Sequence, residues 1–240
     1  MSQSDDPSAN IDVHGARLVA DVSGALFWPA ASALIVADLH FEKASSFAQK
    51  GVALPPYDTS ATLNRLTELV RVYAPSRLIS LGDAFHDTQW ASRMSPQDQA
   101  RLKDLAQATQ MIWVMGNHDP EPPAGLPGMA TDVYRHDADG ALVFRHEPLD
   151  VQDPGFELGE VAGHLHPCGR IRQRGKSLRK RCFVSDGRRL ILPAFGALTG
   201  SLNVRDAAFQ GLFADAYDAW LLGQRRIAKV SRRQLLPDRF

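Results

Sequence analysis

Side chains that commonly bind metal ions stand in five short motifs of this chain, and each motif follows an apolar run. The carboxyl ends of parallel strands lie at one edge of an α/β sheet, so we expect the motifs to meet in one cleft. Asp, His and Asn together suit two divalent cations, and such a pair of cations indicates phosphoester hydrolysis. The motifs are Asp38-Leu39-His40, Gly82-Asp83, Gly116-Asn117-His118-Asp119, His146 and Gly163-His164-Leu165-His166.

Each motif by itself also has an ordinary structural explanation, as a turn or as the exposed end of a strand. Alternate residues of an extended segment point to the same side, so Asp38 and His40 are expected to share a cation. The same reasoning applies to His164 and His166. Five motifs that all follow apolar runs favour one common site over five unrelated turns.

Three residues within the motifs are expected to have different roles at the metal site. The Asp83 carboxylate is suited to bridge two cations, and Asn117 offers a neutral carbonyl oxygen to one of them. His118 follows directly and is expected to lie near the metals without binding them. There it would stabilise or protonate the leaving oxygen.

The pattern of apolar residues, turn residues and prolines predicts the elements that position these motifs. Strand and helix alternate as far as residue 115, which argues for parallel pairing with crossover helices. A second β-rich half packed on the first would give two sheets with helices outside. We expect strands at 16–20, 25–28, 34–37, 78–81, 111–115, 131–134, 142–145, 160–162, 189–192, 211–213, 217–222 and 226–230, and helices at 43–51, 58–73 and 95–109.

The composition bounds the class of protein. The chain has 240 residues, 44% of them hydrophobic, which predicts a single domain over residues 11–240 after a disordered tail at 1–10. The formal net charge is +0, so the overall charge gives no indication of a nucleic-acid partner. Two cysteines exclude a disulfide framework, and no apolar run has the length of a membrane span. We therefore expect a cytoplasmic protein without a membrane partner.

In order and in residue type, the five motifs resemble those of the calcineurin-like metallophosphoesterase superfamily. The resemblance implies an α/β fold, a four-layer αββα sandwich of two mixed β-sheets flanked by helices. It also implies two divalent metal ions, with Mn as the first choice for a mixed nitrogen and oxygen shell and with Fe, Zn or Ni as alternatives. For the ligands it implies Asp38, His40 and His166 at the first metal, Asn117, His146 and His164 at the second, and Asp83 between them.

For catalysis, the resemblance implies that His118 is the catalytic histidine and that Asp119 orients it. The second motif departs from the usual pattern Gly-Asp-x-x-Asp, because its second aspartate, Asp87, comes one residue late. His86 occupies the expected place. No role in supporting the metal ligands is therefore assigned to Asp87. His86 is expected to face the substrate.

Residues around the motifs add a narrower resemblance. Segments 37–43, 82–86 and 163–167 are similar to the bacterial ligase-associated DNA-damage-response endonucleases. This resemblance implies a phosphodiesterase that cleaves nucleic acid, here DNA, in DNA repair. It also implies a DNA ligase or a helicase as partner proteins.

A basic segment between residues 170 and 189 follows the last motif and carries nine Lys and Arg residues against one Asp. Because it begins directly after His166, we expect it beside the metals, where it would follow a nucleic-acid backbone. A solvated hairpin is the structural alternative. The residues assigned to substrate binding are His86, Arg170, Arg172, Arg174 and Lys176.

Two other functions compete with a nuclease. A phosphomonoesterase or a phosphodiesterase of small nucleotides would have little need for the basic segment. A scaffold without catalysis would be expected to have lost ligands or His118, and all of them are present here. Phe85 and Trp90 suit either base stacking or the hydrophobic core.

Overall fold

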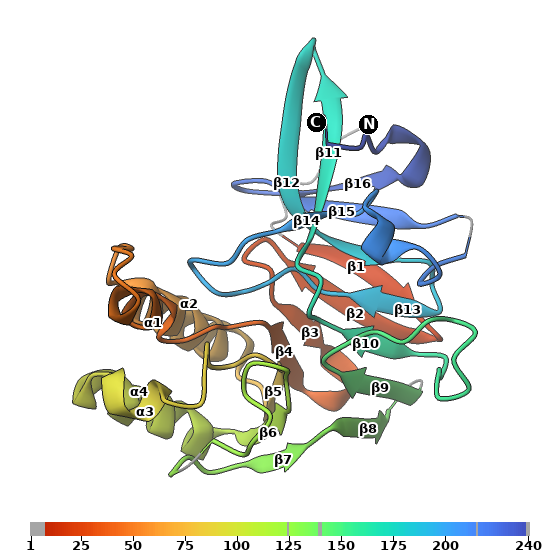
Figure 1. The fold of residues 1–240 in the computed structure, drawn as a ribbon. Helices are drawn as coiled ribbons and strands as arrows, with labels where there is room; N and C mark the ends of the chain where they lie inside the picture. The colour runs from red at the N-terminus through yellow and green to blue at the C-terminus, as the bar shows by residue number, and fades with distance from the viewer. Residues whose placement is uncertain (1–7, 124, 139–140, 215, 239–240) are drawn as a thin grey trace.

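The computed structural model describes residues 8–123, 125–138, 141–214 and 216–238, and these form two mixed β-sheets with helices (Figure 1). The first sheet contains β1 (Ser8–Val13), β2 (Ala16–Asp21), β3 (Leu26–Trp28), β4 (Ala33–Ala37), β5 (Arg77–Leu81), β6 (Gln110–Val114) and β7 (Met129–Thr131). The second contains β8 (Val133–Asp137), β9 (Ala141–Arg145), β10 (Glu160–Ala162), β11 (Pro167–Gln173), β12 (Lys176–Ser185), β13 (Arg189–Ile191), β14 (Leu202–Asn203), β15 (Asp218–Leu222) and β16 (Ile227–Ser231). The α-helices are α1 (Lys43–Gln49), α2 (Asp58–Tyr73), α3 (Trp90–Arg93) and α4 (Pro96–Ala108).

In the first sheet the strands lie in chain order, antiparallel from β1 to β4 and parallel from β4 to β7. The parallel pairs β4–β5 and β5–β6 are joined by crossover connections that contain α2 and α4. The Ser95 side chain caps α4 by accepting from the Asp98 N–H, and Pro96 occupies the first turn. As a result, β4, β5 and β6 end side by side at one edge of the sheet.

In the second sheet, β10 lies parallel to both β9 and β13. Buried apolar side chains of both sheets, such as Ile35 and Phe144, form one core between them. A second core lies between the first sheet and the helices, with Leu63 and Leu105 as members. The sheets are therefore stacked through apolar contact, and their strand ends meet.

The α/β class with two mixed sheets is confirmed, but the helices cover one sheet only (Figure 1). Within the described part of the chain, short 3₁₀ turns (η2, Ala207–Phe209, and η3, Arg232–Gln234) stand where a fourth, helical layer was expected. Phe209 and Leu235 belong to the small core on that side. No helix in the described residues is both long and apolar enough to cross a bilayer.

Three local predictions differ from the structure. Residues 8–10 belong to β1, since their backbone pairs with β2, whereas 1–7 lie outside the described residues. The single strand expected at 131–134 is two strands in different sheets, because Thr131 Oγ1 bonds to Val133 and turns the chain. Residues 211–213 form a turn, not a strand.

A buried ion pair joins β10 to β13 at their first residues. Glu160 and Arg189 are both 0% exposed, and 3.1 Å separates Glu160 Oε2 from the Arg189 guanidinium. Arg145 lies 3.1 Å from the other carboxylate oxygen, and the Arg189 guanidinium covers the Phe156 ring. Burial raises the pKa of Glu160 although Arg189 opposes the shift.

We expect Arg189→Met to lower the free energy of unfolding by about 3–5 kcal/mol, because the Glu160 carboxylate then stays buried with Arg145 alone. Urea unfolding followed by tryptophan fluorescence measures the loss. Glu160→Gln combined with Arg189→Met removes both charges. This double variant is expected to recover a large part of the lost free energy of unfolding. A double variant as unstable as the single one would contradict this explanation.

Candidate metal centre

The five motifs meet at one place, where strands of both sheets end. Asp38 and His40 follow β4, Asp83 follows β5, and residues 117–119 follow β6. His146 follows β9 in the second sheet, and residues 164–166 follow β10. Two sets of side chains hold their ligand atoms within 4.8 Å of one another: Asp38, His40 and His166, and Asp38, Asp83 and His146.

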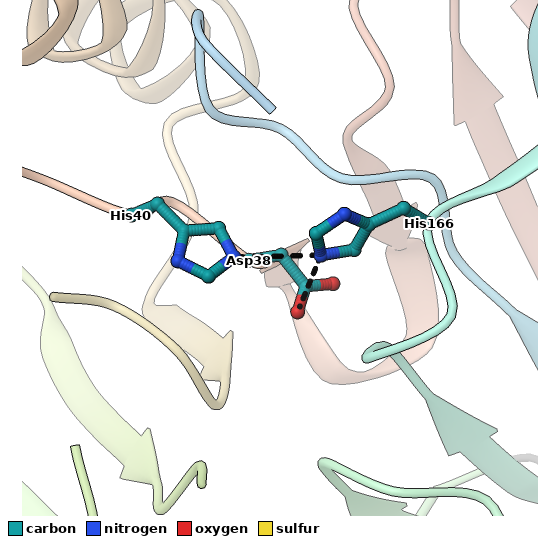
Figure 2. A group of neighbouring side chains, drawn as sticks. All are labelled: Asp38, His40 and His166. Atoms are coloured by element: carbon teal, nitrogen blue, oxygen red, sulfur yellow. Dashed lines mark hydrogen bonds and ion pairs between the residues drawn. The ribbon is translucent and has the colours of Figure 1, made fainter. Parts of the chain in front are cut away.

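The first set joins Asp38 and His40, which follow β4 of the first sheet, with His166, which follows β10 of the second (Figure 2). His40 Nε2 and His166 Nε2 are 3.4 Å apart, and His166 Nε2 is 3.3 Å from Asp38 Oδ1. Asp38 is completely buried and His40 nearly so, whereas His166 is half-buried. The set is therefore reached from solvent on the His166 side.

Asn117 and His164 extend the second set around His146. His146 Nε2 lies 3.0 Å from Asn117 Oδ1, 3.1 Å from His164 Nδ1 and 3.4 Å from Asp83 Oδ1. The other carboxylate oxygen, Asp83 Oδ2, lies 3.7 Å from His40 Nε2. Asp83 thus turns one oxygen toward each set.

These separations fit metal ions. Two ligand atoms that each bind one ion at about 2.0–2.2 Å lie roughly 3–4 Å from each other. The six separations given above fall between 3.0 and 3.7 Å. Most of these atoms are lone-pair donors, which would repel one another unless a proton or a cation lies between them.

The backbone of the centre is not extended, contrary to the prediction for the Asp-x-His and His-x-His pairs. The angle φ is +54° at Asp38 and +45° at His40, and it is +67° at His164 and +45° at His166. Asp83 has φ of +45° as well. For a residue other than glycine, this left-handed conformation costs about 1–2 kcal/mol of free energy. Such residues concentrate at functional sites.

Backbone hydrogen bonds hold this arrangement. The His40 N–H donates to the Asp83 carbonyl at 2.9 Å, and the His164 N–H donates to the Asp38 carboxylate at 3.1 Å. A side chain on Gly116 would run into the Asp83 backbone and carboxylate, so only glycine fits there. The glycines before Asp83, Asn117 and His164 therefore permit the close approach of neighbouring segments, whereas Ala37 precedes Asp38.

The His146 ring is oriented by the main chain. Its Nδ1 lies 3.0 Å from the Leu81 carbonyl, which only accepts, so Nδ1 carries the proton and Nε2 faces the ligands. Burial by itself lowers the pKa of His146, but the Asp83 and Asp38 carboxylates raise it to about 9. Burial lowers the pKa of His40 to about 3, although Asp83 opposes the shift.

We expect metal binding to release about one proton near pH 7.5, because His146 is protonated in the metal-free protein and must be neutral to bind a metal. Its folded pKa of about 9 exceeds the ordinary 6.5, so protonated His146 stabilises the metal-free fold below pH 6.5. That contribution disappears as the pH rises through 9. Titration calorimetry of Mn²⁺ in buffers of different ionisation enthalpy measures the release, and heats independent of the buffer would refute it.

His118 is positioned by a carbonyl, not by Asp119 as expected. Its Nδ1 donates to the His86 carbonyl at 2.9 Å, and its N–H donates to Asp83 Oδ1 at 2.9 Å. The Asp119 carboxylate instead accepts from the backbone N–H groups of Phe85 and Gly116. Asp119 thus fixes the turn that carries His118, and His118 Nε2 points into the centre, 4.0 Å from Asp83 Oδ2.

The His86 ring lies at the rim of the centre. It stacks on His118 with ring centroids 5.1 Å apart and also contacts the rings of His40 and Phe47. Burial, with a smaller effect of His118, lowers its pKa to about 4, so the ring is neutral at pH 7. Asp87 turns away and pairs with Arg93 at 2.6 Å.

The structure also places two other candidates for contact with the substrate. Phe85 and Trp90 are stacked on each other at 3.9 Å and buried, so they belong to the core. The basic segment forms the hairpin of β11 and β12, which projects away from the two sheets (Figure 1). At about 3.3 Å per residue, Arg174 near its turn lies roughly 25 Å along the strand from His166.

Arg170, Arg172, Arg174 and Lys176 lie along this two-stranded ribbon, and their contact with substrate stays a prediction. Arg170 bonds to Ser177 and pairs with Asp238. Arg172, Arg174 and Lys176 are exposed.

A connection that none of the sequence motifs indicated also borders the centre. We call residues 193–201 the strap. The Phe195 N–H donates to the Ala37 carbonyl and the Gly196 N–H to the Asp38 carbonyl, at 2.8 and 3.1 Å. The strap follows the apolar run of β13. In the sequence, that run was the one feature that could have indicated a further strand ending at the centre.

Comparisons with known proteins identify a family and similar structures. The family model of calcineurin-like phosphoesterases matches residues 31–199. The crystal structure of the Pseudomonas putida nuclease MPE aligns with 29% identity and a TM-score of 0.66, over 93% of this chain and 100% of that chain. The phosphoesterase Yfce from E. coli aligns with 17% identity and a TM-score of 0.43, over 82% of this chain and 97% of that chain. No curated protein matches the chain.

Proposed function

The chain belongs to the calcineurin-like phosphoesterases, hydrolytic enzymes that use divalent metals, and on that premise we propose that it is a dinuclear metal-dependent phosphodiesterase that cleaves nucleic acid. The observation that carries the proposal is the meeting of two ligand sets around Asp38, with Asp83 facing both. The similarity to a nuclease over nearly the whole chain supports nucleic acid as the substrate class.

In this proposal Asp38, His40 and His166 would hold one ion, and Asn117, His146 and His164 would hold the other. Asp83 would offer an oxygen to each. Bound divalent ions would lower the pKa of a water and neutralise charge on the phosphoryl oxygens. Mn is the first candidate, and Fe, Zn and Ni suit the same mixed shell.

The protein's own contribution to the chemistry is centred on His118. Its Nδ1–H bond to the His86 carbonyl leaves Nε2 facing the centre, where a proton on it would be given to the leaving alkoxide. Asp119 keeps the turn in place through two backbone bonds. His86, stacked on this ring at the half-buried rim, is proposed to contact the substrate.

DNA is the proposed substrate, with a role in DNA repair and with a ligase or helicase as partner. The hairpin would then contact the strand several nucleotides from the cleaved bond. We place the protein in the cytoplasm, in agreement with two free, buried cysteines.

Metal-stripped protein given Mn²⁺ and offered bis-p-nitrophenyl phosphate, p-nitrophenyl phosphate and labelled single-stranded DNA tests the proposal. We expect Mn-dependent cleavage of the diester and of DNA. Turnover of the monoester alone would indicate a phosphomonoesterase, and no turnover with any common divalent metal would indicate a scaffold.

A further inference from the structure

The strap joins the two segments that carry the first ligand set. At its start it bonds to the backbone of Ala37 and Asp38, and directly after its end the Leu202 N–H donates to the His166 carbonyl at 3.0 Å. The Ala197 N–H donates to Thr62 Oγ1 on α2. The strap therefore lies between the metal centre, α2 and the base of the β11–β12 hairpin.

Two arginines from distant parts of the chain converge on it. Arg65 of α2 donates to the Phe195 carbonyl, and its guanidinium lies 4.1 Å from the centroid of the Phe195 ring. Arg181 of β12 donates to the neighbouring Ala194 carbonyl at 2.8 Å. The two guanidinium groups thus bond to consecutive carbonyls of one short segment.

Neither arginine has a carboxylate partner among the described residues. In the part of the chain that the structure describes, no ion pair within 4.0 Å involves Arg65 or Arg181, whereas Arg179, which also bonds to the strap, pairs with Asp238. Arg65 Nε is buried without a hydrogen-bond partner. Burial and the charge of Arg181 lower the pKa of Arg65 to about 10, so the two cations repel each other.

We propose that Arg65 and Arg181 form a binding site for a substrate phosphate next to the one that is cleaved. Two half-buried cations without a counter-ion are costly, and an anion placed between them would relieve both their repulsion and their desolvation. A phosphodiester held at the centre has its neighbouring phosphates close by. The inference rests on the proposed function and names the residues that would distinguish a polynucleotide from a small diester.

Arg65→Gln and Arg181→Gln test the site, with Arg77→Gln as the matched control. Arg77 is also half-buried, donates to a carbonyl (Ala31) and has a buried Nε without a partner, but it lies at the opposite end of β5. We expect each test variant to lower the ratio of kcat/KM for DNA to kcat/KM for bis-p-nitrophenyl phosphate about tenfold or more. The control is expected to leave that ratio unchanged.

A second measurement uses the wild-type protein and avoids any effect on folding. Single-stranded oligonucleotides carrying one neutral methylphosphonate at successive positions around the cleavage site replace one phosphate charge at a time. We expect a methylphosphonate at one position next to the cleavage site to reduce cleavage about tenfold in wild type. In Arg181→Gln, the same methylphosphonate is expected to have little further effect.

The outcomes separate the two proposals. If wild type cleaves DNA but neither the ratio nor any methylphosphonate position responds, the phosphate site is refuted and the nuclease proposal stands. If both substrates lose activity equally in the variants, the arginines only position the strap, and the inference fails. If wild type hydrolyses the small diester but neither binds nor cleaves DNA, the nuclease proposal itself fails.

Discussion

His118→Ala is expected to lower kcat for DNA cleavage by about 10²–10⁴-fold while the protein keeps its metals. The ring is not in either ligand set, and the bond that joins this residue to Asp83 comes from its backbone N–H, which alanine retains. Steady-state kinetics and metal analysis by mass spectrometry measure the two quantities.

The loss should depend on the leaving group. p-Nitrophenolate leaves with little help from an acid, so we expect bis-p-nitrophenyl phosphate to lose less activity than DNA. His136→Ala serves as the control, since that ring packs on Trp28 and Tyr134 and contacts no candidate ligand. Equal losses on both substrates would speak against proton donation by His118, and loss of metal would assign it a ligand role.

Asp83→Asn is expected to lower kcat/KM roughly 10³-fold and to weaken metal binding. The substitution keeps the shape of the side chain and an oxygen for the His118 N–H, but it removes the charge between His40 Nε2 and His146 Nε2. Electrostatic stabilisation by a metal pair contributes several kcal/mol, which corresponds to a loss of this size.

Metal content after dialysis against Mn²⁺, together with activity at saturating Mn²⁺, checks this expectation. Asp87→Asn is the control, because this carboxylate lies four residues further along, pairs with Arg93 and has no bond to the candidate ligands. An Asp83→Asn protein that holds two metals and retains wild-type activity would show that Asp83 does not bridge.

Much of the first half of the fold follows from local pattern. The apolar runs at 34–37 and 78–81 are strands because they are buried on both faces of a parallel sheet. The helix at 58–73 follows from apolar residues at helical spacing that end at Ala74 before Pro75. The strands of the second half follow less clearly from local pattern. Short strands such as β7 and β8 belong to different sheets although they are adjacent in the chain.

The ligand residues could be selected from the sequence, but the reason for their proximity could not. Asp38 and His40 come together through left-handed backbone rather than through strand alternation. That conformation is stabilised by hydrogen bonds to segments near Gly82 and Asp83, which are distant in the chain. Local sequence therefore predicts residue type at a strand end, whereas the direction of the side chain depends on neighbouring strands.

The sequence by itself determined the chemistry of this protein: which carboxylates, imidazoles and amide stand at strand ends, and hence that a metal centre is expected. The tertiary structure alone decided that the His86 carbonyl, and not Asp119, orients His118. It also decided that the basic hairpin points away, while Arg65 and Arg181 bond to consecutive carbonyls of the strap. The physical reason is that residue type sets what a side chain can bind, whereas hydrogen bonds and ion pairs between distant segments set where it lies.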